Sequence, residues 1–256
     1  MTPWLSVFGR IGSGLRFAGP ALLDLLLPGS CAGCGKMNTL PQKSWCPACW
    51  SQIPWVISPL CTLCGRPFRD SGASFDHLCG ECIKSAFHFD TARSATFHEG
   101  IVRDRIHQFK FGSQTEWAPP LVELMQTAHT GSGLPAPDLI VPVPLHPGRI
   151  AKRGFNQSGL LAGEFARKIK APVSFNIVRR KNQTLPQTRL NREQRLRNVM
   201  GAFEVTDVMR VRGRRILLVD DVFTTGTTLS ECAKTLKRKG KASEVHALTV
   251  TRALPD

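Results

Sequence analysis

The fold of this chain is decided by thirteen residues late in its sequence, Leu217-Leu218-Val219-Asp220-Asp221-Val222-Phe223-Thr224-Thr225-Gly226-Thr227-Thr228-Leu229. The run Ile216 to Val219 is apolar throughout, which is typical of a parallel strand buried on both faces. Two adjacent acids and a hydroxyl-rich loop follow, and residues 229–239 then have a helical pattern that Gly240 would end. This order predicts a loop at the carboxyl edge of a sheet, where open α/β folds bind ligands.

The hydroxyl-rich loop predicts a phosphate site. Backbone N–H groups in the first turn of a helix point outward and carry partial positive charge, so they attract phosphate. Gly226 lets the backbone approach a ligand closely. Asp220 and Asp221 would repel a phosphate, but they could accept hydrogen bonds from the vicinal hydroxyls of a ribose or lie near a divalent metal. Further hydroxyl donors come from four threonines: Thr224, Thr225, Thr227 and Thr228.

Adjacent acids after a strand also occur in other phosphate-handling folds. P-loop ATPases require the pattern G-x-x-x-x-G-K-[ST], which this sequence does not contain. Phosphatase-type sites usually space their two acids by one residue, whereas Asp220 and Asp221 are adjacent. The pattern therefore favours a ligand that carries both phosphate and sugar, with a purely structural role as the alternative.

These residues resemble the phosphoribosyl pyrophosphate (PRPP) signature of type I phosphoribosyltransferases. The segment Asp138 to Gln157, which contains Arg153-Gly154-Phe155-Asn156-Gln157, resembles the ComF family of competence and GntX-like proteins. Residues 187–203 and the cysteine-rich N-terminal half are similar to the same family. The resemblance covers roughly residues 20–253 and implies an α/β fold with a mostly parallel sheet of the type I phosphoribosyltransferase type, preceded by a small double zinc-binding module.

The periodicity of the chain agrees with alternating strands and helices. A polar, basic segment without periodicity, residues 179–198, is expected to be a long mobile loop, and residues 15–27 a short amphipathic helix. The expected strands are residues 90–97, 139–143, 173–178, 200–205, 215–219 and 245–251. The expected helices are residues 99–111, 117–129, 157–170 and 229–239.

Eight of the nine cysteines form four C-x-x-C pairs: Cys31/Cys34, Cys46/Cys49, Cys61/Cys64 and Cys79/Cys82. This spacing lets two thiolates reach one tetrahedral ion, and the gaps between pairs are close to those of zinc ribbons. Two structural zinc sites with four cysteine ligands each are predicted, with sequential pairing preferred and cross-braced pairing possible. A disulfide framework would need an oxidising compartment, which nothing here indicates. The ninth cysteine, Cys232, is expected to be a small buried apolar residue.

Length and composition agree with one sizeable domain and a small module. The chain has 256 residues, of which 42% are hydrophobic, so wholesale disorder is excluded. We expect a cysteine-rich zinc module over residues 20–87 and a phosphoribosyltransferase-like domain over residues 88–256. No run of 18 apolar residues is present, so no membrane span is expected. Nothing reads as an export signal, and the reduced cysteines favour the cytoplasm.

The positive charge is unevenly distributed. Residues 1–90 carry 7 basic and 5 acidic side chains, whereas residues 149–215 carry 17 basic and 4 acidic ones. A PRPP site would use several of these charges, and the surplus favours single-stranded nucleic acid as a partner. The alternative is a solvated basic surface that aids solubility.

The resemblance implies roles for individual residues. The loop Thr224 to Thr228 would hold the 5-phosphate of PRPP, while Asp220 and Asp221 would face the ribose hydroxyls and act as catalytic residues. Mg²⁺ bound with PRPP would neutralise the pyrophosphate. The remaining implied positions are a pyrophosphate loop at residues 144–153 that includes Arg153, a hood at residues 187–198 with Arg189, Arg192 or Arg195, and Lys110 with Phe111.

Two functions are compatible with these features. The first is a ComF-like protein that binds PRPP, takes part in DNA uptake or utilisation, and works with other DNA-uptake or recombination proteins. The alternative is an active phosphoribosyltransferase with an unknown acceptor, since no pocket for a particular base is recognisable. A transcriptional regulator with PRPP as effector is less favoured, because no helix-turn-helix pattern is found.

Overall fold

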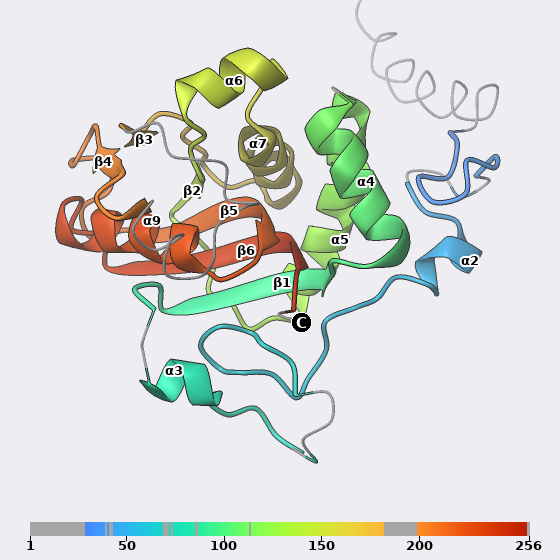
Figure 1. The fold of residues 1–256 in the computed structure, drawn as a ribbon, viewed down its shortest axis with the longest axis horizontal. Coiled ribbons are helices and arrows are strands. Elements are labelled where there is room, and N and C mark those ends of the chain that lie inside the picture. Colours follow the sequence, from blue (N-terminus) through green and yellow to red (C-terminus); the bar gives the residue numbers. More distant parts are fainter. Residues whose placement is uncertain are drawn as a thin grey trace, which may run out of the picture. The chain divides into compact units, whose positions relative to one another are not determined.

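A parallel sheet of four strands forms the centre of the fold (Figure 1). The computed structural model describes residues 29–254 except 39, 41–42, 69–71, 73, 85–86, 113 and 182–198. The chain divides into two compact units, Met1–Ser51 and Gln52–Asp256, and the sheet belongs to the second. Its strands, in spatial order, are β1 (Thr91–Phe97), β6 (Glu244–Arg252), β5 (Arg215–Phe223) and β2 (Leu139–Pro142), all parallel. The predicted mostly parallel α/β sheet is therefore confirmed.

Helices cover both faces of this sheet (Figure 1). On one face α5 (Ala118–Thr130) packs against α7 (Gln157–Ile169), and both lie on the strands. On the other face α9 (Thr227–Arg238) packs on β6 and on the short strand β4 (Phe203–Val205). The remaining elements of this region are α4 (Gly100–Phe111), the 3-10 turn η1 (Thr115–Trp117) and α6 (Pro147–Arg153).

The burial pattern explains why α9 lies where it does. Its buried apolar residues recur at helical spacing, so they form one stripe that faces the sheet: Leu229, Cys232, Ala233 and Leu236. Cys232 is fully buried in that stripe, as expected for a small apolar residue. The helix turns its basic residues outward, and Lys237 and Arg238 lie in its last turn, where cations are favourable.

Two predicted elements have different limits in the structure. Strand β5 continues to Phe223, four residues beyond the predicted end, because β6 runs alongside it as far as Arg252. The two acids therefore lie inside a strand and not after it. The predicted basic loop at residues 144–153 contains the helix α6, which ends at Gly154 with φ +84°.

The predicted strands at residues 173–178 and 200–205 are shorter than expected. Val173 forms a single parallel bridge with Ile140, and the chain then bends before β3 (Val178–Arg180). Strand β3 pairs with β4 (Phe203–Val205) in an antiparallel ladder. The predicted mobile loop and hood lie almost wholly in residues 182–198, outside the described residues, and the expected helix at residues 15–27 lies outside them too.

The cysteine-rich region is divided between the two units. The first two C-x-x-C pairs, together with α2 (Pro47–Trp50), belong to the unit of residues 1–51. The other two pairs and α3 (Gly80–Lys84) belong to the unit that contains the sheet. The domain boundary expected between residues 87 and 88 stays a prediction. Along the chain, the division between the two compact units falls between residues 51 and 52. Among the described helices, none is both long and apolar enough to cross a membrane.

Candidate ligand cavity and metal centres

A cavity of about 670 Å³ lies at the carboxyl edge of β2 and β5, where α7 and α9 begin. Parallel strands of an open sheet end at this edge, so it is the expected place for a ligand. The polar and charged residues that line it are His98, Lys110, Arg149, Arg153, Gln157, Ser158, Arg180, Asp220, Asp221, Thr224, Thr227 and Thr228.

The two acids of β5 are held by groups from two different helices. Ser158 Oγ, in the first turn of α7, donates to Asp220 Oδ1 at 2.7 Å. Lys110 Nζ, near the end of α4, lies 3.1 Å from Asp221 Oδ2. Burial of Asp220 and the negative charge of Asp221 raise the pKa of the Asp220 carboxyl to about 7. Near neutral pH Asp220 is therefore partly protonated, so its carboxyl can either accept a hydrogen bond from a ligand hydroxyl or donate one.

The loop after β5 places the N-terminus of α9 at the cavity. Gly226 is the N-cap of this helix with φ +72°, and no side chain caps its first turn. Helix N-termini attract anions through their N–H groups and their dipole, so this end of α9 suits a phosphate. Thr225 Oγ1 and Thr227 Oγ1 are 2.7 Å apart and form a hydrogen bond that orders the loop.

Three arginines also line the cavity. Arg149 and Arg153 come from α6, and Arg180 comes from β3. Burial and the positive charge of Arg153 lower the pKa of Arg149, while burial and Arg149 lower the pKa of Arg180. Three cationic side chains on one cavity make its lining attractive to an anionic ligand.

Gln157 adds a donor without a partner to the cavity lining. Its side chain is 1% exposed, it is the first residue of α7, and its Nε2 has no hydrogen-bond partner. A buried amide without a partner costs free energy, so this group fits a ligand oxygen.

The structure brings most of the predicted ligand residues together. One cavity is lined by both acids, Lys110, Arg153, Gly226 and three of the threonines. Thr225 does not line it but forms a hydrogen bond with Thr227. Arg189, Arg192 and Arg195 lie outside the described residues. Sequence patterns assigned no role to His98, Gln157, Ser158 or Arg180. Ser158 could have been found from its place at the start of the helix that follows the motif, but Arg180 reaches the cavity only through the β3–β4 pairing.

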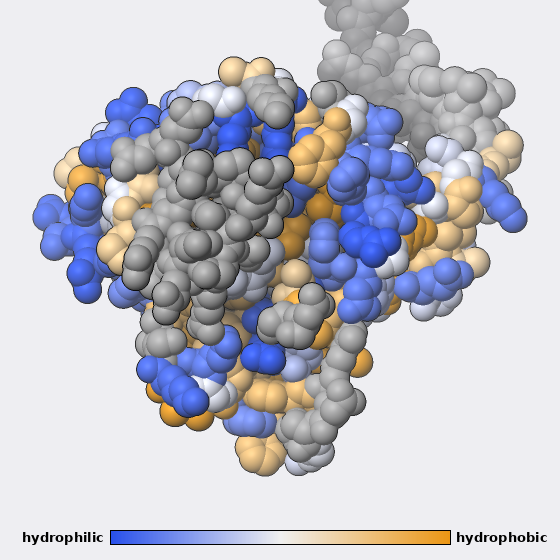
Figure 2. Space-filling model, in the orientation of Figure 1, coloured by the Kyte–Doolittle hydropathy of each residue, from blue (hydrophilic) through white to orange (hydrophobic). Residues whose placement is uncertain are grey.

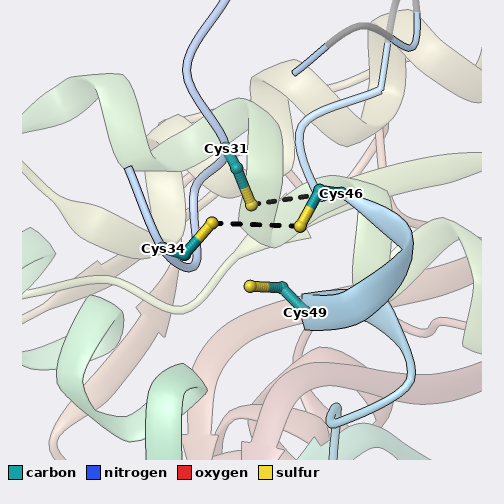
Figure 3. A group of neighbouring side chains, drawn as sticks. All are labelled: Cys31, Cys34, Cys46 and Cys49. Carbon is teal, nitrogen blue, oxygen red and sulfur yellow. Dashed lines mark hydrogen bonds between the residues drawn. The ribbon is translucent and has the colours of Figure 1, made fainter. Parts of the chain in front are cut away.

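The first four cysteines form one compact cluster (Figure 3). Their sulfur atoms point toward one another, and Cys34 Sγ lies 3.9 Å from Cys46 Sγ. The backbone N–H groups of Gly33 and Cys46 donate to Cys31 Sγ at 3.3 and 3.2 Å. Such N–H donors stabilise a thiolate, which is the form that binds a metal.

The second cluster is built in the same way but is wholly buried, with the cysteines 0–5% exposed. Cys64 Sγ lies 3.9 Å from Cys79 Sγ. Hydrogen bonds from the Cys64 thiol and from the backbone N–H groups of Cys64 and Cys79 outweigh burial and lower the pKa of Cys61 to about 4. The hydrogen bond to Cys61 and burial raise the pKa of the Cys64 thiol well above its usual range.

Both clusters fit a tetrahedral metal ion. A Zn–S bond of about 2.3 Å places the sulfurs of a tetrahedral site about 3.8 Å apart, close to the separations found here. The ligand atoms within each cluster all lie within 4.8 Å of one another. The grouping is sequential, 31/34/46/49 and 61/64/79/82, which was the preferred pairing. Two clusters of four cysteines, both compatible with zinc ribbons, are therefore present.

Two family descriptions match the chain: a double zinc ribbon domain over residues 22–83 and a phosphoribosyl transferase domain over residues 151–254. Sheet, cavity and clusters thus define a phosphoribosyltransferase-type protein with an N-terminal zinc-ribbon-like region. Purine phosphoribosyltransferase from Pyrococcus horikoshii Ot3 is similar at a TM-score of 0.31 and 15% identity, covering 57% of this chain and 85% of that one.

Curated relatives identify the family. The DNA utilization protein YhgH of Escherichia coli K12 is 34% identical over 224 residues, 86% of this chain and 95% of the relative. Competence protein F of Haemophilus influenzae Rd is 30% identical over 228 residues, 87% of this chain and 96% of the relative. The chain therefore belongs to the ComF family of competence and DNA-utilisation proteins.

Proposed function

We propose that this protein binds PRPP in the cavity at the carboxyl edge of the sheet. The observation that carries the proposal is the convergence of the α9 phosphate loop and the Asp220–Asp221 pair on one cavity. A phosphate at the α9 N-terminus leaves the sugar beside the acids, and the arginines and Gln157 of the same cavity are then the groups that would receive the pyrophosphate. Mg²⁺ bound with PRPP would supply further neutralisation of its charge.

Calorimetric titration with PRPP and Mg²⁺ tests this proposal. The wild type should bind, and Asp220→Ala/Asp221→Ala should lose at least about 100-fold in affinity, because two hydrogen-bonding carboxylates are removed. Asp104→Ala is the matched control, since Asp104 is an exposed acid on α4 that does not line the cavity. Absence of binding by the folded wild type would overturn the proposal.

Turnover is the second candidate function. An active enzyme would displace pyrophosphate at the anomeric carbon, with the positive charge of the sugar transition state stabilised beside Asp220 and Asp221. Arg192 of the expected hood, which lies outside the described residues, would take part in this reaction. Pyrophosphate release measured with a panel of bases and nucleotides separates the two functions. Release with one acceptor establishes the transferase, and release with none leaves a PRPP-binding factor of DNA uptake or utilisation.

A basic surface supports single-stranded nucleic acid as the partner. It lies at the far end of the sheet, where two adjacent turns are joined by Gly213 N donating to Lys241 O and by Ser243 N donating to Arg214 O. Hydrophilic residues gather along this edge, at the left of Figure 2. Within the described residues, none of its six exposed cations has an acidic partner: Arg210, Arg212, Arg214, Arg238, Lys239 and Lys241.

This end surface is separate from the cavity, since β5 runs from Arg215 beside it to Phe223 beside the loop. Nine strand residues span about 26 Å between their ends. PRPP and nucleic acid should therefore bind together without competing. The family also implies association with other DNA-uptake or recombination proteins, and thiolate clusters that need reduced cysteines favour the cytoplasm.

Fluorescence anisotropy with a labelled single-stranded oligonucleotide tests the end surface. Arg212→Gln/Arg214→Gln/Lys239→Gln should weaken binding and reduce the slope of log K against log salt by about 0.7 for each phosphate that the variant no longer neutralises. Arg103→Gln/Arg167→Gln/Lys168→Gln removes the same charge from α4 and α7 and is the control. If both variants weaken oligonucleotide binding equally, binding is not localised to the end surface. If PRPP displaces the oligonucleotide, the nucleic acid binds at the cavity and not at the end surface.

A further inference from the structure

Arg252, the last residue of β6, is a buried cation that has no acidic partner within the described residues. Its side chain is 6% exposed, and Nη1 donates to the backbone oxygen of Cys64 at 2.6 Å while Nη2 lies 3.6 Å from Cys64 Sγ. Burial of a guanidinium without a counter-charge is costly, and the cysteine cluster beside Arg252 is the source that the described contacts point to. Four thiolates around one divalent ion carry a net charge of about −2, which supplies that counter-charge.

The same guanidinium also lies over an aromatic ring. Arg252 Cζ lies 4.2 Å from the centroid of Phe223, and the two residues are partners in the β5–β6 register. Phe223 is fully buried and is the last residue of β5, directly before the phosphate loop. A cation over a ring at this distance is attractive, and more so when it is desolvated.

Phe223 in turn packs directly against the phosphate loop. A Cβ added at Gly226 would lie 2.6 Å from Phe223 Cζ and 2.9 Å from Phe87 Cε1, so the loop backbone rests directly on these two rings. Phe87 also stacks on Phe89 at 4.7 Å, which fixes the floor from the side of the cysteine-rich segment. The loop and the second cluster are therefore linked by a continuous series of contacts: Cys64, Arg252, Phe223 and Gly226.

We infer that Arg252 is a positioning residue that links the metal in the Cys61–Cys82 cluster to the phosphate loop. The metal-bound thiolates hold Arg252, Arg252 holds the ring of Phe223, and the ring sets the position of Gly226 at the start of α9. Occupancy of this cluster thus determines how well the loop is formed for a phosphate. The effect on PRPP affinity rests on the proposed function, whereas the effect on the loop does not.

The chain offers a matched control in Arg93. This second arginine also lies beside the cluster and donates to Thr62 O at 3.2 Å and to Ala92 O at 2.9 Å. It does not lie over Phe223. Arg93→Met therefore removes a cation from the same cluster without breaking the contact with the loop support, and Arg252→Met removes both.

The experiment measures hydrogen exchange of the amides of residues 224–229 in the unliganded full chain, together with PRPP affinity and zinc content. Arg252→Met should accelerate loop exchange and weaken PRPP at least about tenfold, while Arg93→Met stays close to wild type. Arg252→Lys, which keeps the positive charge, should have the zinc content of the wild type. Its loop amides should exchange more slowly than those of Arg252→Met but faster than those of the wild type. Phe223→Leu should loosen the loop while leaving the visible spectrum of the cobalt-substituted cluster unchanged, so it tests the same series of contacts if Arg252→Met does not fold.

Unchanged loop exchange in both Arg252→Met and Phe223→Leu would overturn the inference, as would equal effects of Arg252→Met and Arg93→Met. If the wild type binds no PRPP but Arg252→Met still loosens the loop, the proposed function fails and the positioning role stands.

Discussion

The two cysteine clusters have the same four ligands and similar spacing, yet their surroundings differ. In the unit of residues 1–51, Cys34 is exposed and Cys46 half-buried. In the unit of residues 52–256, all four cysteines are buried and belong to the hydrophobic core that also holds Phe89 and Phe223. The same motif therefore occurs in two settings: the first cluster lies in a short, partly exposed segment, and the second belongs to the core on which the loop after β5 packs.

The largest expected effect separates the clusters by stability. Cys61→Ser/Cys64→Ser should lower the Tm of the sheet-containing unit by about 10 °C or more, because a structural zinc site contributes several kcal/mol to folding. Cys31→Ser/Cys34→Ser should change this transition by less than about 2 °C. Differential scanning calorimetry measures both, with zinc content as the check that one ion is lost in each variant. Equal shifts would break the comparison.

A second effect concerns access to the two ions. A chelator should remove zinc from the first cluster at least about ten times faster, because release from the second requires local opening of the core. A colorimetric zinc assay after addition of the chelator should show two phases of equal amplitude. The Cys31→Ser/Cys34→Ser variant should lack the fast phase, and a single phase for both ions in the wild type contradicts the expectation.

A third prediction tests the contact between the loop at Gly226 and the rings of Phe223 and Phe87, which lie near the second cluster. Gly226→Ala should cost about 2–4 kcal/mol, since it adds a clash with Phe223 and Phe87 to the strain of a positive φ. Gly100→Ala is the control, because Gly100 also has a positive φ, +51°, but a Cβ there meets nothing within 4 Å. Denaturant unfolding compares the two variants, and equal destabilisation would mean that the rings yield without cost.

The smallest effect tests the acid pair, which contacts neither cluster. The pKa of Asp220 is raised to about 7 in the folded protein, so ionisation destabilises the fold as pH rises from about 4 to about 7. Asp220→Asn cannot ionise, and its Oδ1 can still accept from Ser158. Because a shift of one pKa unit corresponds to about 1.4 kcal/mol, we expect the variant to be at least about 1 kcal/mol more stable than the wild type above pH 7 and equally stable near pH 4. Thermal unfolding across this range measures the difference, and a gap that widens toward low pH would contradict it.

The sequence predicted most of the scaffold because its signals are local. The apolar run before Asp220 and the helical stripe of α9 each reveal an element without any knowledge of its neighbours. The extent of β5 could not be predicted, since Asp220 and Asp221 are charged and only pairing with β6 extends the strand through them. Helix α6 was also missed, because a basic segment that contains Pro147 and Gly148 has little local helical signal.

The candidate site divides along the same line. Contiguous motifs predicted the phosphate loop, the acids and the four C-x-x-C pairs, since each depends on residues that are close in sequence. Lys110 was placed through the family resemblance. Gln157 and Ser158 reach the cavity from the first turn of α7, and Arg180 reaches it from β3. The sequence patterns gave none of the three a role.

The sequence by itself determined the ligand types: thiolates spaced for tetrahedral ions, and a glycine and hydroxyls spaced for a phosphate. These are local properties, because a knuckle or a helix N-terminus is formed by a few consecutive residues. The tertiary structure alone decided that the second cluster lies against the core, since Cys64 and Arg252 are 188 residues apart and meet only when β6 aligns with β5. The same alignment buries Arg252 between Cys64 and Phe223, and on this contact rests our inference that the second cluster supports the loop after β5.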